Sequence, residues 1–268
     1  MIRKVVSGFT FQVPWKGGTG HVNVLASLIF SGMTGSAVAD ASGLGLMEIA
    51  AMRKEGYDDG FSCAITAASA TIGPIFPPSI PFIVYSMLSG ASVGNLFLAG
   101  MVPGILLAIA LMMYVAYIAN KRNYPSGVKY TLREFLAFTA KAFPALMTPV
   151  ILLAGIYTGV MTPTEAGAVA AFYALMISIF VYRTMGVERL LQILVDTAKT
   201  TGVLGLIVGG AFSFSYIVAI EKVPFVVSNA MLSLTDNKYV FLLLVNILFL
   251  LLGMVIDTAV LQLVFIPI

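Results

Sequence analysis

The sequence predicts an all-α integral membrane protein, and three observations lead to this fold class. Hydrophobic residues make up 59% of the 268 residues, and charged residues only 10%. The mean hydropathy is +0.99, whereas a soluble domain carries about 25% charged residues. The apolar residues also form successive runs between short charged loops, as helices that cross a bilayer do. The net charge of +3 gives no indication of nucleic-acid binding, so membrane lipid is the expected environment.

The first apolar region predicts a re-entrant helical hairpin. Residues 1–16 are too polar to cross a membrane and form an atypical N-terminal segment. Two apolar legs follow, at 22–29 and 41–52, and the sequence SGMTGSAVAD lies between them at 31–40. Each leg is shorter than the ~20 residues that a span needs. We therefore expect a hairpin that enters and leaves the membrane on one side.

A discontinuous helix is expected next, over residues 61–88. The sequence GPIFPPSIP at 73–81 interrupts this apolar run. Proline removes a backbone donor and clashes with the preceding turn, so the helix must break there.

The rest of the chain predicts further spans and a second hairpin. The expected spans are 93–119, 135–159, 166–182 and 201–220, with a shorter apolar piece at 225–234. Thr162 is the expected N-cap of the third span, with Pro163 at its first position and Glu165 complementing the positive helix end. Residues 183–199 are amphipathic and predict a helix lying in the interface. The last run enters at 239–252 and breaks at 253–258.

The distribution of Lys and Arg predicts the topology. The loop at 121–133 carries four basic residues and no acid, so it is expected to be cytoplasmic. Counting spans from it opens the first hairpin to the cytoplasm and the second, near 253–258, to the outside. Opposite entries are typical of an inverted repeat. We expect a first repeat at 17–134 and a second at 135–268, which ends before a counterpart of the broken helix.

The two polar interruptions predict a cation site. Ser31, Thr34 and Ser36 supply hydroxyl groups, and the glycines between them allow the backbone to expose carbonyls. The end of the broken helix at 71–74 also leaves carbonyls without helical partners. Unwound backbone that lines a cavity in this way coordinates sodium ions in transporters. The alternative is that these small residues only allow close helix packing.

Two carboxylates, Asp40 and Asp257, lie near the hairpin tips, and buried acids in membranes are usually functional. Asp257 can pair with the Thr258 hydroxyl and an ion, whereas Asp40 has either a functional role or caps the second leg of the hairpin. An intramembrane hydrolase would use both acids. The chain has no P-loop sequence, and one His and one Cys build no metal cluster or relay. Transport, and no enzyme activity, is the favoured interpretation.

Several segments together carry a resemblance to a known family. They are NVLAS at 23–27 followed by 31–40, GYDD at 56–59, ITAASATIGPIFPPS at 65–79, LAGMVPG at 98–104 and GIYTGVMTPTEA at 155–166. These residues resemble the large membrane subunit of the TRAP (tripartite ATP-independent periplasmic) transporters over about 17–268. The resemblance implies a sodium-driven, elevator-type importer with several spans in the bacterial inner membrane.

The resemblance also implies partners and site residues. A periplasmic solute-binding protein would deliver an organic acid, such as a C4-dicarboxylate or sialic acid, and a small four-helix membrane subunit would support the permease. Sodium ions are the only cofactor implied. The implied sodium ligands are Ser31, Gly32, Gly35, Ser36, Thr71, Gly73, Pro74, Pro77, Gly253, Asp257 and Thr258. The expected substrate contacts are Ser36, Thr71 and Ser79.

The family's initial spans are missing before the first hairpin, so we expect a truncated subunit that would not transport alone. The alternatives are a stand-alone sodium/divalent-anion symporter and a non-functional fragment of the permease.

Overall fold

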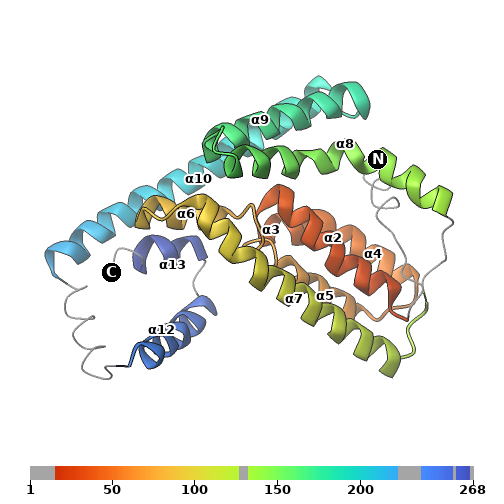
Figure 1. Cartoon of the computed structure of the whole chain (residues 1–268), viewed down its shortest axis with the longest axis horizontal. Helices are drawn as coiled ribbons and strands as arrows, with labels where there is room; N and C mark the ends of the chain where they lie inside the picture. Colours follow the sequence, from red (N-terminus) through yellow and green to blue (C-terminus); the bar gives the residue numbers. More distant parts are fainter. Residues whose placement is uncertain (1–15, 127–131, 223–236, 256–257, 266–268) are drawn as a thin grey trace. The chain divides into compact units, whose positions relative to one another are not determined.

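A computed structural model of the chain describes residues 16–126, 132–222, 237–255 and 258–265 (Figure 1). All regular elements in these residues are helices, which confirms the all-α prediction. Within the described ranges, four stretches are long and apolar enough to cross a membrane: Val93–Lys121, Thr139–Tyr157, Pro163–Val181 and Val187–Ile207.

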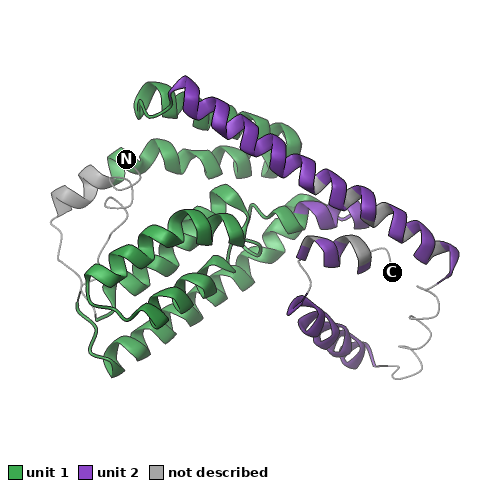
Figure 2. Cartoon of the chain, turned by 180° about the vertical axis from the view of Figure 1, so that it is seen from behind, with its two compact units in different colours: residues 1–82, 92–185 green, residues 83–91, 186–268 purple. Residues whose placement is uncertain are grey.

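The chain forms two compact units, coloured separately in Figure 2. Unit 1 comprises residues 1–82 and 92–185, and unit 2 comprises residues 83–91 and 186–268. Helices α8 (Leu132–Tyr157) and α9 (Pro163–Met176) pack on each other within unit 1. This division by packing does not follow the expected repeat boundary at 134–135. An inverted repeat is a statement about symmetry, and it stays a prediction.

The first hairpin is present, but its break is shorter than the predicted 31–40, because only Gly35 and Ser36 lie between the two helical legs. Its first leg is α2 (Gly18–Thr34), and its second leg is α3 (Ala37–Asp40), the π-helical η1 (Ala41–Gly45) and α4 (Leu46–Lys54). The hydroxyl of Thr19, at the start of α2, donates to the Glu55 carboxylate just after α4. Both legs therefore meet at one end. The 17 residues of α2 are about 26 Å long, less than the ~30 Å hydrocarbon core, as a re-entrant leg requires.

The discontinuous helix is also confirmed. Helix α5 (Asp59–Ala70) ends in turns over 71–78, and α6 (Ile80–Ser89) begins beyond them. Helix α7 (Val93–Lys121) packs against α2 and α5. Gly17 and Gly20 allow a close approach to α7, because a Cβ on each would lie 2.6 Å from Cβ of Ala119 and 2.8 Å from Cγ1 of Val115, respectively. The hairpin, the break and α7 thus form one packed group.

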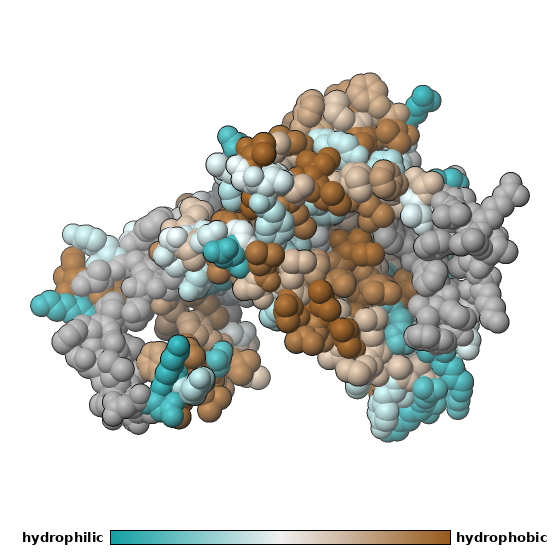
Figure 3. All heavy atoms as spheres, viewed as in Figure 1, coloured by the Kyte–Doolittle hydropathy of each residue, from teal (hydrophilic) through white to brown (hydrophobic). Residues whose placement is uncertain are grey.

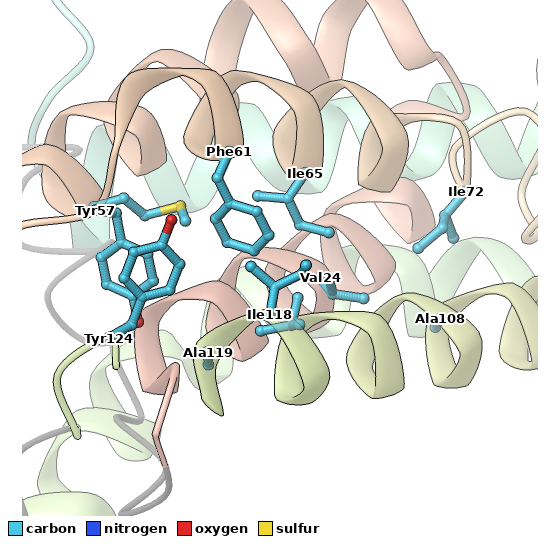
Figure 4. Packing of buried hydrophobic residues seen from close by; sticks show 11 residues of the cluster. Val24, Tyr57, Phe61, Ile65, Ile72, Ala108, Ile118, Ala119 and Tyr124 are labelled. Carbon is cyan, nitrogen blue, oxygen red and sulfur yellow. The ribbon is translucent and has the colours of Figure 1, made fainter. Parts of the chain in front are cut away.

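The core of unit 1 lies between α2, α5 and α7. Figure 4 shows Val24 of α2, Phe61 and Ile65 of α5, and Ile118 of α7 pointing into one cluster. The outer surface of this unit is also apolar: hydrophobic side chains cover much of the face seen in Figure 3. Exposed side chains of α7 include Leu98, Val102, Leu106, Met113 and Tyr117. Such a surface suits lipid rather than water.

The charged loops of unit 1 meet at one end, as the topology predicts. Arg122 donates to Asp58 over 2.5 Å, and the Tyr124 hydroxyl donates to the same carboxylate. The Tyr124 hydroxyl, the Phe61 N–H and the Arg122 guanidinium lower the pKa of Asp58 to about 2. These bonds fasten the loop before α5 to the loop after α7. The two loops therefore lie on the same side.

Unit 2 contains α10, α12 and α13. Helix α10 (Val187–Ile220) is one continuous helix of 34 residues, so the prediction of a separate interfacial helix at 183–199 is wrong. The sequence between the two predicted pieces contains no helix breaker, and the hydroxyls of Thr197 and Thr200 bond carbonyls four residues earlier. Helices α12 (Lys238–Gly253) and α13 (Thr258–Phe265) confirm the second break. The apolar piece predicted at 225–234 lies outside the described residues.

Candidate functional site

The tip of the first hairpin is a turn of two residues between helices. Gly35 ends α2 with φ +60°, and its N–H donates to the Ser31 carbonyl over 3.0 Å. A left-handed φ favours glycine because a side chain there would crowd the following carbonyl. Ser36 is extended, with φ −138°, and its hydroxyl accepts the Ala39 N–H over 3.4 Å. Ser36 is therefore the N-cap of the second leg.

The tip touches the break in the discontinuous helix. The Ile80 N–H donates to the Gly35 carbonyl over 3.4 Å. A Cβ added to Gly35 would lie 2.5 Å from the Pro78 carbonyl oxygen, and one added to Gly73 would lie 3.1 Å from the Ser36 carbonyl carbon. Only glycine allows backbones to approach this closely. The structure therefore brings together the two interruptions that the sequence singles out.

Four helix ends converge at this contact. Helices α2 and α5 arrive with their C-terminal ends, at Thr34 and Ala70, whereas α3 and α6 leave with their N-terminal ends, at Ala37 and Ile80. In the described residues, no backbone N–H donates to the carbonyls at 32–34. Helix C-termini carry partial negative charge and N-termini partial positive charge. The contact can therefore attract a cation to one pair of ends and a carboxylate to the other.

The predicted hydroxyl groups of unit 1 lie in the segments that form this contact, and the following ones have local partners. Ser31 is fully buried and donates to the Leu28 carbonyl over 2.6 Å. Thr71 is exposed and donates to the Ala68 carbonyl over 2.6 Å. Ser79 donates to the Pro74 carbonyl over 2.5 Å. A hydroxyl oxygen that donates its proton keeps lone pairs for an ion or a ligand.

The remaining predicted residues of unit 1 have different surroundings. Pro77 is buried in the break. Gly32 packs against α8, because a Cβ there would lie 3.4 Å from Cβ of Pro149. This contact favours the interpretation that Gly32 allows close helix packing. The Gly32 carbonyl nevertheless points toward the C-terminal end of α2, as helical carbonyls do.

Asp40 does not cap the second leg, so that alternative is wrong. Ser36 has this position, because its hydroxyl is adjacent to the first free N–H groups of α3. Asp40 is 1% exposed, and neither carboxylate oxygen has a hydrogen-bond partner in the described residues.

The second hairpin belongs to unit 2. Gly253 ends α12 and Thr258 begins α13. A Cβ on Gly253 would be 3.8 Å from Cδ1 of Leu261, an ordinary contact. Asp257 lies outside the described residues, so the part it has in a sodium site stays a prediction.

The structure also contains a ladder of buried polar side chains between α2 and α5, which the sequence analysis did not include in the predicted site. The Asn23 amide nitrogen donates to the Thr66 hydroxyl over 2.7 Å, and its oxygen accepts the Ser69 hydroxyl over 2.9 Å. The Ser27 hydroxyl donates to Ser69 over 3.0 Å. The sequence contains a pattern that could have predicted this ladder, because Asn23, Ser27 and Ser31 recur every four residues on one face of α2. The ladder fastens the first leg to the helix that carries the break.

Nearly the whole chain is similar to known proteins. Residues 10–268 match the family described as "Tripartite ATP-independent periplasmic transporter, DctM component". The chain is 46% identical over 251 residues to the sialic acid TRAP transporter large permease protein SiaM of Vibrio cholerae, covering 94% of this chain and 59% of that protein.

Two other curated proteins are similar over the same part of the chain. The identity is 42% to the sialic acid TRAP transporter permease protein SiaT of Haemophilus influenzae, covering 94% of this chain and 41% of that protein. It is 36% to the C4-dicarboxylate TRAP transporter large permease protein DctM of Pseudomonas aeruginosa, covering 94% of this chain and 59% of that protein. The chain therefore spans less than two thirds of the length of these relatives.

Proposed function

The chain belongs to the DctM component family of the tripartite ATP-independent periplasmic transporters, and we propose that it forms part of a sodium-coupled permease for organic acids. The observation that carries this proposal is the contact between Gly35 and the segment at 78–80, where four helix ends meet. Sodium ions bind at the C-terminal ends of α2 and α5, with backbone carbonyls as the main ligands. A multi-pass position in the bacterial inner membrane accompanies this function.

The substrate carboxylate binds at the N-terminal ends of α3 and α6. Ser36 and Ser79 cap these ends, so their hydroxyls are the nearest side-chain groups to the bound anion. Among the relatives compared, those named for sialic acid are 46% and 42% identical, and the one named for C4-dicarboxylate is 36% identical. An acidic sugar such as sialic acid is therefore the first substrate to test.

An elevator-type movement fits the way in which the site is built. Asn23 and Ser27 bond to α5 below the tip, and Gly35 contacts the break above. The hairpin and the discontinuous helix are thus fastened at two levels, so they can move as one body that carries the site. A small four-helix membrane subunit supports the large permease subunit, and a periplasmic binding protein delivers the acid.

Uptake by proteoliposomes tests this function. The complete permease, which includes this chain, is reconstituted with its small subunit, and sialic acid is supplied with the binding protein. Uptake is expected only with an inward sodium gradient and only with the binding protein present. Uptake of free acid without that protein would instead identify a stand-alone symporter. Equal uptake with potassium would contradict sodium coupling.

Two variants test where the sodium ions bind. Ser36→Ala removes a hydroxyl at the tip, and Gly73→Ala adds a Cβ that would lie 3.1 Å from the Ser36 carbonyl carbon. Both changes are expected to raise the sodium concentration for half-maximal uptake. Gly43→Ala is the matched control, because no atom lies within 4 Å of its added Cβ. An unchanged sodium requirement in both variants would contradict the proposed site.

A further inference from the structure

Glu48 of α4 is a carboxylate in the interior of unit 1. It is 5% exposed, and neither carboxylate oxygen has a hydrogen-bond partner in the described residues. An ionised carboxylate without partners is very costly in such surroundings, so the group must bind a cation or become neutral. Ionisable groups buried in membrane proteins mark functional sites by default.

Glu48 faces α2. Residues 48, 52 and 55 recur at intervals of four and three, so they share one face of the chain at the end of the hairpin. Sδ of Met52 accepts from the Asn23 amide nitrogen over 3.9 Å, and the Glu55 carboxylate accepts from Thr19. Glu48 lies on the same face, one turn closer to the hairpin tip than Met52. It therefore lies beside the part of α2 that carries the polar ladder.

The helices that pack on α4 are α2, α5 and η1, and they offer no countercharge. No Lys or Arg is among the buried residues that the structure describes. Arg53 is exposed and pairs with Asp59 over 2.5 Å. His21 of α2 is two positions before Asn23, so it points to about the opposite side of that helix. Asp40, earlier on the same leg, interacts electrostatically with Glu48 and offers like charge, not countercharge.

A metal ion is the less suitable occupant. No group of three or more His, Cys, Asp or Glu side chains that could hold a metal occurs in the described part of the chain. The ladder offers hydroxyl and amide groups, and these already bond to one another through Asn23, Thr66 and Ser69. A proton needs no further ligands, because it neutralises the carboxylate by one O–H bond. The resulting acid can also donate to a neighbouring oxygen.

We propose that Glu48 is a proton-binding site of the hairpin, separate from the sodium site proposed at the tip. The proton comes from solvent and forms an O–H bond to one carboxylate oxygen of Glu48. The site depends on burial and on the absence of a countercharge, so it stands whether or not the proposed substrate is correct.

Infrared spectroscopy of the purified complete permease at neutral pH tests this site. A protonated carboxylic acid has a carbonyl stretch that an ionised carboxylate lacks. We expect this band in the unmodified protein, with loss of intensity in Glu48→Gln and unchanged intensity in Glu188→Gln, which changes an exposed acid of α10. Asp40 is also buried without a hydrogen-bond partner in the described residues, so Asp40→Asn is a second comparison, and it should leave the part of the band that Glu48→Gln removes. A band of unchanged intensity in Glu48→Gln would overturn the proposal.

Thermal unfolding gives an independent readout. Glutamine has the shape of the protonated acid, so Glu48→Gln should leave the melting temperature at neutral pH unchanged. Loss of folding in this variant would show that a charge is required, and the proposal would fail. At alkaline pH, the unmodified protein should lose stability relative to Glu48→Gln because it then buries an unpaired charge. Parallel melting curves across this range, or a tenfold weaker sodium affinity in Glu48→Gln at neutral pH, would also overturn it.

Discussion

Substitution of Gly35 by alanine perturbs the site at its narrowest point. Gly35 has φ +60°, and the new Cβ would lie 2.5 Å from the Pro78 carbonyl oxygen and 3.0 Å from the Ile80 nitrogen. Both neighbours are backbone atoms, which cannot turn away as a side chain does. The tip and the break must therefore move apart to accept the methyl group.

The expected cost has two parts. A left-handed conformation costs a residue other than glycine roughly 1–2 kcal/mol. An extra methyl group in a packed region adds about 1–3 kcal/mol, so the sum for Gly35→Ala is about 2–5 kcal/mol. If the tip and the break separate in the variant, this strain is relieved in the sodium-free protein. Sodium binding must then bring the two segments together again, and the strain reduces the binding free energy. Since roughly 1.4 kcal/mol corresponds to a factor of ten, sodium affinity should fall by at least about tenfold.

The assay compares sodium titrations and thermal unfolding of matched glycine variants. Gly56→Ala is the control for the backbone conformation alone, because Gly56 has φ +86° and no atom lies within 4 Å of its added Cβ. It should lower stability without changing sodium affinity. If Gly35→Ala and Gly56→Ala give the same sodium titration, then the contact at 78–80 does not support the cation site, and the reasoning is refuted.

Three further predictions concern the surroundings of the site. Asn23→Leu removes the side chain that joins Thr66 to Ser69 and buries an apolar group against both hydroxyls, so it should destabilise the protein by about 1–3 kcal/mol, measured by denaturant unfolding; an unchanged midpoint would contradict this role. Thr162→Ala removes the N-cap of α9 and should cost about 0.5–2 kcal/mol, whereas Thr162→Ser should restore most of the melting temperature. The pKa of Asp58 is lowered from 3.8 to about 2, mainly by the Tyr124 hydroxyl, so its stabilising contribution is complete above pH 3.8 and is lost as the pH falls to about 2. The melting temperatures of Asp58→Asn and the unmodified protein should therefore differ at neutral pH and converge in acid.

The features that the sequence predicted well are those that depend on local backbone chemistry. The break after Ala70 follows from prolines that cannot continue a helix. The cap at Thr162 follows from a residue type with a strong positional preference, whereas the first leg was expected to end at 29 and α2 continues to Thr34. The pairing of the tip with the break was also expected, because polar backbone interruptions in a membrane need shared burial.

The features that were missed depend on which helix faces meet. Asn23 and Thr66 are 43 positions apart, and nothing local to either residue predicts their hydrogen bond. The π-helical segment at 41–45 also depends on packing: a Cβ on Gly45 would lie 2.6 Å from Cγ2 of Thr66. The continuous α10 was missed because an amphipathic stretch and an apolar stretch were assigned to separate helices, although no residue between them ends a helix.

The ladder and the tip contact have a joint consequence for coupling. A re-entrant hairpin held only at its tip could open without disturbing the helix that carries the break, and a bound ion would then stabilise the hairpin alone. Asn23 and Ser27 bond to α5 two or more turns below Gly35, so the hairpin cannot leave α5 without breaking buried hydrogen bonds. Binding free energy gained at the tip is therefore shared by α2 and α5. Under the proposed function, this sharing would let a small ion select between positions of a whole group of helices, since a ligand shifts such an equilibrium only by its difference in affinity for the two states.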